Sequence, residues 1–315
     1  MITSYLFLVF VMFHIVCCMP KTQQHKINKP DMLELRKRSD FHPSERTLDC
    51  FDMVGIEGDY VYTPTERRRQ CTVYFIGNFM DELVEFQIRQ IDIPCNGNKL
   101  QIFDGWKLGG AVFPSEEEHA YSMENRQFEA CGEDSDSVFI SSQNVAMLSF
   151  PTNIGSFKIT FRTRKNPKPC HAMAPDSSGE YDLLNYGERR NCTFLVIYPV
   201  TISIIQMTVG DPSIETKLKC FSEPDQVQFL EGNGLDYGLM RTEQVMCGST
   251  ETVEVQDYES TNDTTTAAGI VCKRSGLSIP LQCQSSTVRL ISSGQTDNHV
   301  RIKFSKLSPS FNECL

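Results

Sequence analysis

The cysteines are the residues of this sequence whose number and spacing most clearly indicate a chemistry. The chain has thirteen cysteines, spread along its length at wide intervals. It contains no Cys-x-x-Cys pair and no His-Glu-x-x-His motif, and its six histidines are scattered. Tetrahedral zinc sites and zinc-dependent hydrolysis are therefore poorly supported. In an oxidising compartment, wide spacing of this kind predicts a framework of disulfide bonds.

The sequence also gives little support for nucleophilic catalysis. The sequence has no Gly-x-Ser-x-Gly motif, and no histidine has a fixed partner nearby in sequence. The net charge of −10 disfavours a nucleic-acid partner and permits basic or amphipathic ones. We therefore expect a binding protein without a cofactor rather than an enzyme. A secreted hydrolase, or an accessory subunit of one, is the alternative, and a broad hydrolase screen would separate the two.

The N-terminal residues indicate the compartment. An apolar run from Tyr5 to Val16 is too short to span a bilayer and is followed at once by polar residues. This pattern predicts a signal peptide over residues 1–18, with an uncleaved membrane anchor as the alternative. Two glycosylation sequons, at Asn191 and Asn262, agree with a secreted, extracellular protein that has no membrane partner.

An internal repeat organises the chain. Four pairs of segments match at a spacing of about 120 residues, which is typical of a duplicated domain. The matched pairs are Cys50–Met53 with Cys170–Met173, Arg69–Thr72 with Arg190–Thr193, Asn98–Gly105 with Asp225–Gly232, and Cys131–Gly132 with Cys247–Gly248. Four matches in one register predict two copies of the same unit.

The segments within each repeat are predicted to be β-strands. Phe157–Arg162 and Val300–Ser305 alternate strictly between apolar and polar residues. Further segments rich in Val, Ile, Phe and Thr are residues 72–76, 83–93, 144–150, 193–197 and 201–209. No long helical period occurs, so we expect an all-β fold of antiparallel sandwiches or jelly rolls.

The domain boundaries follow from the repeat. We expect a polar N-terminal segment over residues 19–48, a first domain over 49–165, and a second domain over 166–315 with a C-terminal tail. Between the repeats, residues 164–169 contain two prolines and three basic residues, which favours an extended connector.

Several blocks carry a resemblance to known families. Leu100–Gly105, Cys131–Gly132, Ser141–Val145 and Gly155–Phe157 resemble a CUB domain, an antiparallel sandwich with consecutive disulfides. Narrower blocks are similar to the corticotropin-releasing-factor-binding protein family over about residues 33–314: Phe103–Trp106, Ser141–Met147, Asn191–Thr193, Ile197–Val200 and Gly232–Asp236. The resemblance implies two tandem CUB-like domains.

The same resemblance implies a function and a disulfide pattern. Members of that family are secreted glycoproteins that bind CRF-like amphipathic peptide hormones and keep them from their receptors. A CUB-type adhesion or matrix protein with a protein partner is the alternative, which a binding assay with CRF-like peptides would test. The implied bridges are Cys50–Cys71, Cys95–Cys131, Cys170–Cys192, Cys220–Cys247 and Cys283–Cys314. Cys272 lies outside this pattern, so we expect it to be unpaired or in an intermolecular bond.

Arg46 and Asp52, on either side of Cys50, are the candidate ligand-binding residues. The resemblance implicates the Arg and Asp at these positions in holding the peptide. The repeat adds an independent argument, because the second copy has Asn166 and Ala172 at the matching places. The fold itself should therefore not require the two charges. An exposed pair without a function is the alternative.

Two further features could form a site: the positions that hold calcium in CUB domains, and the single tryptophan. A CUB domain often holds calcium with one Glu and two Asp, but the corresponding residues here are the neutral Gln90, Asn98 and Asn153. The second repeat has Asp225 without a companion acid, so we expect no metal site. Trp106 follows a turn, where it could contact a ligand or cover a sheet, and we favour the structural role.

Overall fold

The computed structural model describes residues 45–65, 69–132, 137–210, 224–249 and 277–307. These residues belong to one compact unit. The predicted signal peptide, Asn262, Cys272, Cys220 and Cys314 lie outside the described residues. Within the described ranges, no helix is long and apolar enough to cross a membrane.

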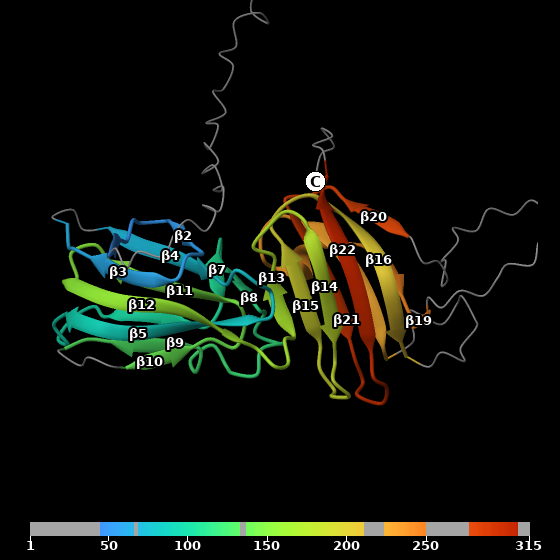
Figure 1. Ribbon diagram of the computed structural model, residues 1–315, viewed down its shortest axis with the longest axis horizontal. Helices are drawn as coiled ribbons and strands as arrows, with labels where there is room; N and C mark the ends of the chain where they lie inside the picture. The colour runs from blue at the N-terminus through green and yellow to red at the C-terminus, as the bar shows by residue number, and fades with distance from the viewer. Residues whose placement is uncertain (1–44, 66–68, 133–136, 211–223, 250–276, 308–315) are drawn as a thin grey trace, which may run out of the picture. The chain divides into compact units, whose positions relative to one another are not determined.

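The first sandwich is built from two five-stranded sheets (Figure 1). One sheet has the order β1 (Arg46–Thr47), β3 (Gly58–Tyr62), β12 (Ser156–Lys165), β5 (Glu82–Asp92) and β10 (Val138–Ile140). The other has the order β2 (Met53–Val54), β4 (Gln70–Ile76), β11 (Val145–Pro151), β6 (Leu100–Phe103) and β9 (Gln127–Ala130). A separate hairpin joins β7 (Trp106–Leu108) to β8 (Ala111–Phe113).

The second sandwich repeats this plan with small differences. One sheet has the order β13 (His171–Met173), β15 (Cys192–Val196), β21 (Ser285–Ile291), β17 (Gln226–Gly232) and β18 (Arg241–Met246). The other contains β14 (Gly179–Leu184), β22 (His299–Lys306), β16 (Val200–Val209) and β19 (Gly248–Ser249), with β20 (Ser278–Leu281) also paired to β16. A short 3-10 helix, η1 (Tyr237–Leu239), follows β17.

The strand order confirms the prediction of an all-β fold with two related sandwiches. The order β2-β4-β11-β6-β9 matches β13-β15-β21-β17-β18, and β3-β12-β5-β10 matches β14-β22-β16-β19. Most pairs are antiparallel, but the short strands β1, β2 and β13 each pair in parallel with a neighbour. Among the described residues of the second sandwich, β1 has no counterpart, and this difference matters for the candidate site.

The predicted connector is shorter than its composition indicates. Arg164 and Lys165 belong to β12, where they pair with Leu83 and Glu82 of β5. The connector interpretation was therefore wrong for these two residues, because pairing along the full length of β5 continues the strand through the basic residues. The next residue, Asn166, still donates its backbone N–H to the carbonyl of Asp81 at 2.8 Å.

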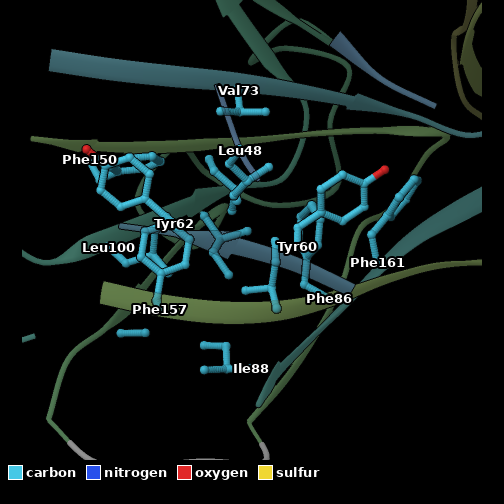
Figure 2. Packing of buried hydrophobic residues seen from close by; sticks show 14 of the residues in the cluster. Leu48, Tyr60, Tyr62, Val73, Phe86, Ile88, Leu100, Phe150, Phe157 and Phe161 are labelled. Carbon is cyan, nitrogen blue, oxygen red and sulfur yellow. The ribbon is translucent and has the colours of Figure 1, made fainter. Parts of the chain in front are cut away.

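Aromatic side chains fill the core of the first sandwich (Figure 2). Tyr62 packs between Phe150 and Phe157, with ring centroids 4.5 and 5.3 Å away. Its hydroxyl donates to the carbonyl of Thr152 at 2.7 Å, so the only polar atom of this side chain is satisfied inside the core. Burial of such rings supplies most of the stabilising free energy of a sandwich.

The predicted alternation is visible in β22 of the second sandwich. Val300, Ile302 and Phe304 are buried, while Arg301 and Lys303 between them are exposed. Because successive side chains of a strand point to opposite faces, this pattern lets one face of β22 line the core. The alternation prediction is confirmed for this strand.

Three disulfide bonds lie within the described residues. They join Cys50 to Cys71, Cys95 to Cys131 and Cys170 to Cys192. These are three of the five pairs that the resemblance implies. Cys247 and Cys283 are also disulfide-bonded. Their expected partners, Cys220 and Cys314, lie outside the described residues, so these two pairs stay predictions.

Candidate functional site

Arg46 lies in β1, at the edge of the first sandwich. Its side chain is partly exposed, and its Nη1 donates to the carbonyl of Glu57 at 3.0 Å. The guanidinium carbon lies 5.7 Å from the centre of the Tyr60 ring. A cation over an aromatic face is attracted by the negative charge of the ring face, so Tyr60 and Glu57 together hold the guanidinium in place.

Asp52 lies between the Cys50–Cys71 bridge and β2. Its carbonyl accepts the N–H of Tyr74 at 2.9 Å, and its Oδ1 accepts the N–H of Met53 at 2.9 Å. The side chain is partly exposed. Its backbone is therefore fixed by a disulfide on one side and by a strand pair on the other, while the carboxylate reaches the surface.

Arg46 and Asp52 both act electrostatically on one hydroxyl, that of Tyr60. Burial raises the pKa of the Tyr60 hydroxyl, the positive charge of Arg46 opposes the rise, and the negative charge of Asp52 adds to it. Both charges therefore lie within electrostatic reach of the same group. The hydroxyl itself donates to the carbonyl of Ile56 at 2.5 Å. We call Arg46, Asp52 and Tyr60 the charged corner.

The second sandwich shows what the fold requires at these places. Met53 pairs with Tyr74 and Met173 pairs with Leu195, each three residues after a bridged cysteine, so Asp52 corresponds to Ala172. Ala172 is fully buried in the core, whereas Asp52 is partly exposed. The matching sandwich thus forms without the carboxylate. Asn166, the expected counterpart of Arg46, lies in no strand.

Trp106 is part of the packing and does not present its ring to the surface. It is 3% exposed, and its Nε1 donates to the carbonyls of Phe75 and Ala146 at 3.1 and 3.2 Å. Tyr74 packs edge-on against the indole with ring centroids 5.1 Å apart. This geometry supports the structural role over the ligand-contact role.

The three residues at the expected calcium positions are exposed and neutral. Gln90, Asn98 and Asn153 are all exposed, and none of them carries the negative charge that would offset dehydration of the ion. Among the described residues, no group of three or more His, Cys, Asp or Glu side chains is arranged to hold a metal ion.

Asp225, the one acid at a matching place, is engaged by the protein itself. Its carboxylate accepts hydrogen bonds from Ser293 Oγ at 2.9 Å, Asn298 Nδ2 at 3.0 Å and Thr296 Oγ1 at 3.2 Å, and another from the Ser293 N–H. Burial alone would raise the pKa of Asp225, but these hydrogen bonds together hold it below its ordinary value. The carboxylate therefore organises the loop between β21 and β22.

Asn191, the first expected glycosylation site, is only partly exposed. It borders a pocket of about 630 Å³ that is also lined by Glu118, Arg190 and Ser292. The third residue of the sequon, Thr193, is buried and donates its hydroxyl to Glu118 Oε2 at 2.6 Å. Glu118 of the first sandwich thus contacts this part of the second, and glycosylation of Asn191 stays a prediction.

Sequence reasoning missed the polar residues that join the two sandwiches. Asn144 is fully buried and holds Met173 with a pair of hydrogen bonds, Nδ2 to the Met173 carbonyl at 2.7 Å and the Met173 N–H to Oδ1 at 2.9 Å. Glu118 forms a buried ion pair with Arg289. Asn144 lies in a block that carried the family resemblance, but a single sequence gives no signal for its partner.

Comparison with known proteins places the chain in a family. Residues 42–166 match the corticotropin-releasing factor binding protein N-terminal domain, and residues 172–265 match the C-terminal domain of the same family. The human corticotropin-releasing factor-binding protein is 30% identical over 277 residues, covering 85% of this chain and 78% of the relative. The Xenopus laevis protein is 30% identical over 283 residues, covering 86% and 80%.

A solved structure also matches. The CUB1-EGF-CUB2 domains of rat MASP-1 align with 9% identity and a TM-score of 0.27, covering 82% of this chain and 100% of that one. The family assignment rests instead on the two domain matches and on relatives that cover most of the chain. It agrees with the resemblance that the sequence blocks indicate. The chain therefore belongs to the corticotropin-releasing factor binding protein family.

Proposed function

We propose that this protein binds a CRF-like peptide hormone outside the cell and sequesters it from its receptor. The relatives that it matches are named for binding corticotropin-releasing factor. The charged corner is the structural observation that supports a particular position for the binding site on this chain. There, Arg46 lies over the Tyr60 ring and Asp52 is within electrostatic reach of the Tyr60 hydroxyl. The matching places of the second sandwich, Asn166 and Ala172, lack both charges.

The proposed mechanism is recognition without catalysis. An amphipathic peptide that is disordered in solution becomes helical on the protein, so its contacts must outweigh the entropy lost on ordering. Arg46 and Asp52 fix the register of the peptide by pairing with charges of opposite sign. Because these side chains are already positioned in the free protein, little additional freedom is lost on binding.

Substitution at the charged corner tests this proposal. We expect Arg46→Ala and Asp52→Ala each to weaken binding of a CRF-like peptide by about 2 kcal/mol, roughly thirtyfold in Kd. Asp52→Asn can still accept the Met53 N–H and removes only the charge, so it should weaken binding to a similar extent. Calorimetric titration of the full secreted chain measures the affinity, and recovery of intact peptide after incubation tests for the absence of hydrolysis.

A matched control uses a charge elsewhere on the same sandwich. Arg69 is exposed and lies outside the charged corner, so Arg69→Ala should bind as wild type does. Wild-type affinity in both Arg46→Ala and Asp52→Ala would place the binding site elsewhere. Loss of folding in both variants would show that the charges are structural.

The proposal also predicts the cleavage, glycosylation and disulfide bonds of the mature protein. We expect protein recovered from the medium to begin after residue 18, to carry glycans at Asn191 and Asn262, and to contain Cys220–Cys247 and Cys283–Cys314 besides the three bridges described. Non-reducing peptide mapping, with and without an N-glycosidase, checks each point. A bridge joining a cysteine before Pro167 to one after it would contradict the division into domains 49–165 and 166–315.

A further inference from the structure

Phe51 has a backbone conformation that is unusual for a bulky residue. It lies between Cys50 and Asp52 with φ of +64°, in the left-handed region. This region favours glycine, because a β-carbon there approaches the backbone too closely, and an aromatic residue in it is strained. The same side chain is 68% exposed, so burial of its ring does not offset the strain.

The fold does not require this conformation. The strand register that relates Asp52 to Ala172 places His171 at the position of Phe51. His171 is a regular residue of β13, paired with Thr193, and its φ is not positive. The second sandwich thus connects the same bridged cysteine to the same strand without a left-handed residue. The strain at Phe51 is specific to the first sandwich.

The backbone on both sides of Phe51 is nevertheless rigid. Its own N–H donates to the carbonyl of Thr72 at 2.7 Å, and the next residue is held by the Tyr74 N–H. The Cys50–Cys71 bridge precedes it directly. The exposed ring is therefore attached to a well-held backbone, one residue before Asp52 of the charged corner.

We propose that Phe51 is the apolar contact residue of the peptide site, packing against an apolar side chain of the bound hormone. This inference rests on the proposed function and deepens it. An exposed aromatic ring on a fixed backbone offers a large contact area with little loss of freedom on binding, and aromatic residues, Phe among them, are enriched at protein interfaces. Arg46 and Asp52 then fix the register of the peptide, while Phe51 contributes affinity.

Variants that separate strain from contact test the proposal. Phe51→Gly and Phe51→Asn both remove the ring and tolerate a positive φ. We expect each to lower the affinity for a CRF-like peptide by about tenfold or more, with a melting temperature equal to or above that of wild type. Phe51→Tyr should retain most of the affinity. Phe79→Ala is the matched control, because Phe79 is a second phenylalanine of this sandwich that is 58% exposed.

The outcomes distinguish this inference from the proposed function. If Arg46→Ala weakens binding while Phe51→Gly and Phe51→Asn bind as wild type does, the inference is overturned and the proposed function stands. A fall in melting temperature in both Phe51 variants would assign the ring a structural role and also overturn the inference. If wild-type protein binds no CRF-like peptide, the proposed function fails first.

Discussion

Gly58 explains how Arg46 can reach the Tyr60 ring. Its φ is +150°, and a β-carbon at this position would lie 2.6 Å from Arg46 Nη1. Any other residue would push the guanidinium away from the ring and from the Glu57 carbonyl. The position of a candidate binding residue thus depends on a glycine twelve residues further along the chain, in the strand β3 that pairs with β1.

The buried indole of Trp106 supports a prediction about stability. Trp106→Phe removes the donor to two buried carbonyls and leaves a small cavity, so we expect a loss of about 2 kcal/mol in the free energy of unfolding. Peptide affinity should stay at the wild-type value, because the ring is buried. Circular dichroism must monitor unfolding here, since the variant has no tryptophan. A large loss of affinity without a loss of stability would instead make Trp106 a ligand contact.

At the scale of elements, the strands were predictable because one face of each lines a core. The predicted segment 201–209 corresponds to β16, and the matched blocks Asn98–Gly105 and Asp225–Gly232 contain β6 and β17. The structure supplies the reason for that match. Asp104, directly after β6, accepts the N–H of Ser142, and Glu231, near the end of β17, accepts the N–H of Cys283. Each buried acid thus holds the segment before β11 or β21.

Other elements could not be predicted from sequence alone. The hairpin of β7 and β8 has only three residues in each strand, too few to show an alternating period. Nothing in the sequence indicates the left-handed conformation of Phe51, because phenylalanine rarely has a positive φ. The contacts of Asn144 and Glu118 join residues far apart in sequence. A single sequence indicates that such polar residues exist but not what they contact.

The loop held by Asp225 supports a prediction about metal removal. Hydrogen bonds from Ser293, Thr296 and Asn298 engage this carboxylate, and the matching places of the first sandwich carry amides. We therefore expect the fold to need no calcium at these positions. We expect a calcium chelator to leave the melting temperature and the peptide affinity unchanged. A drop of several degrees that added calcium reverses would reveal a calcium site.

At the scale of the whole molecule, polar contacts link the two sandwiches. The Glu118 carboxylate accepts hydrogen bonds from Thr193 and Arg289. Ser115 Oγ lies 2.6 Å from the Tyr237 hydroxyl. Breaking a buried ion pair by removing one partner is costly, because the remaining charge is left without compensation. The free energy of unfolding of the full chain should therefore depend on the protonation of groups in this region as well as on packing within each core.

His171, beside Glu118, makes this response testable. Burial lowers the pKa of His171 from 6.5 to about 4; the charge of Glu118 opposes this shift, and His119 and Arg190 add to it. The folded state therefore keeps the ring neutral at pH values where the unfolded chain already binds a proton. Stability falls as the pH drops from about 6.5 towards 4. The carboxyls of Asp104 and Asp225 have pKa values below 3.8, so their contribution is lost only at lower pH.

We expect wild-type protein to lose about 2 kcal/mol of stability between pH 7.5 and pH 5, or roughly 3–6 °C in melting temperature. His171→Gln, which cannot titrate, should lose clearly less over the same range, even if it is less stable at pH 7.5. Calorimetric melting of both proteins at the two pH values measures the difference. An equal loss in both would show that protonation of other groups, and not of His171, destabilises the fold in acid.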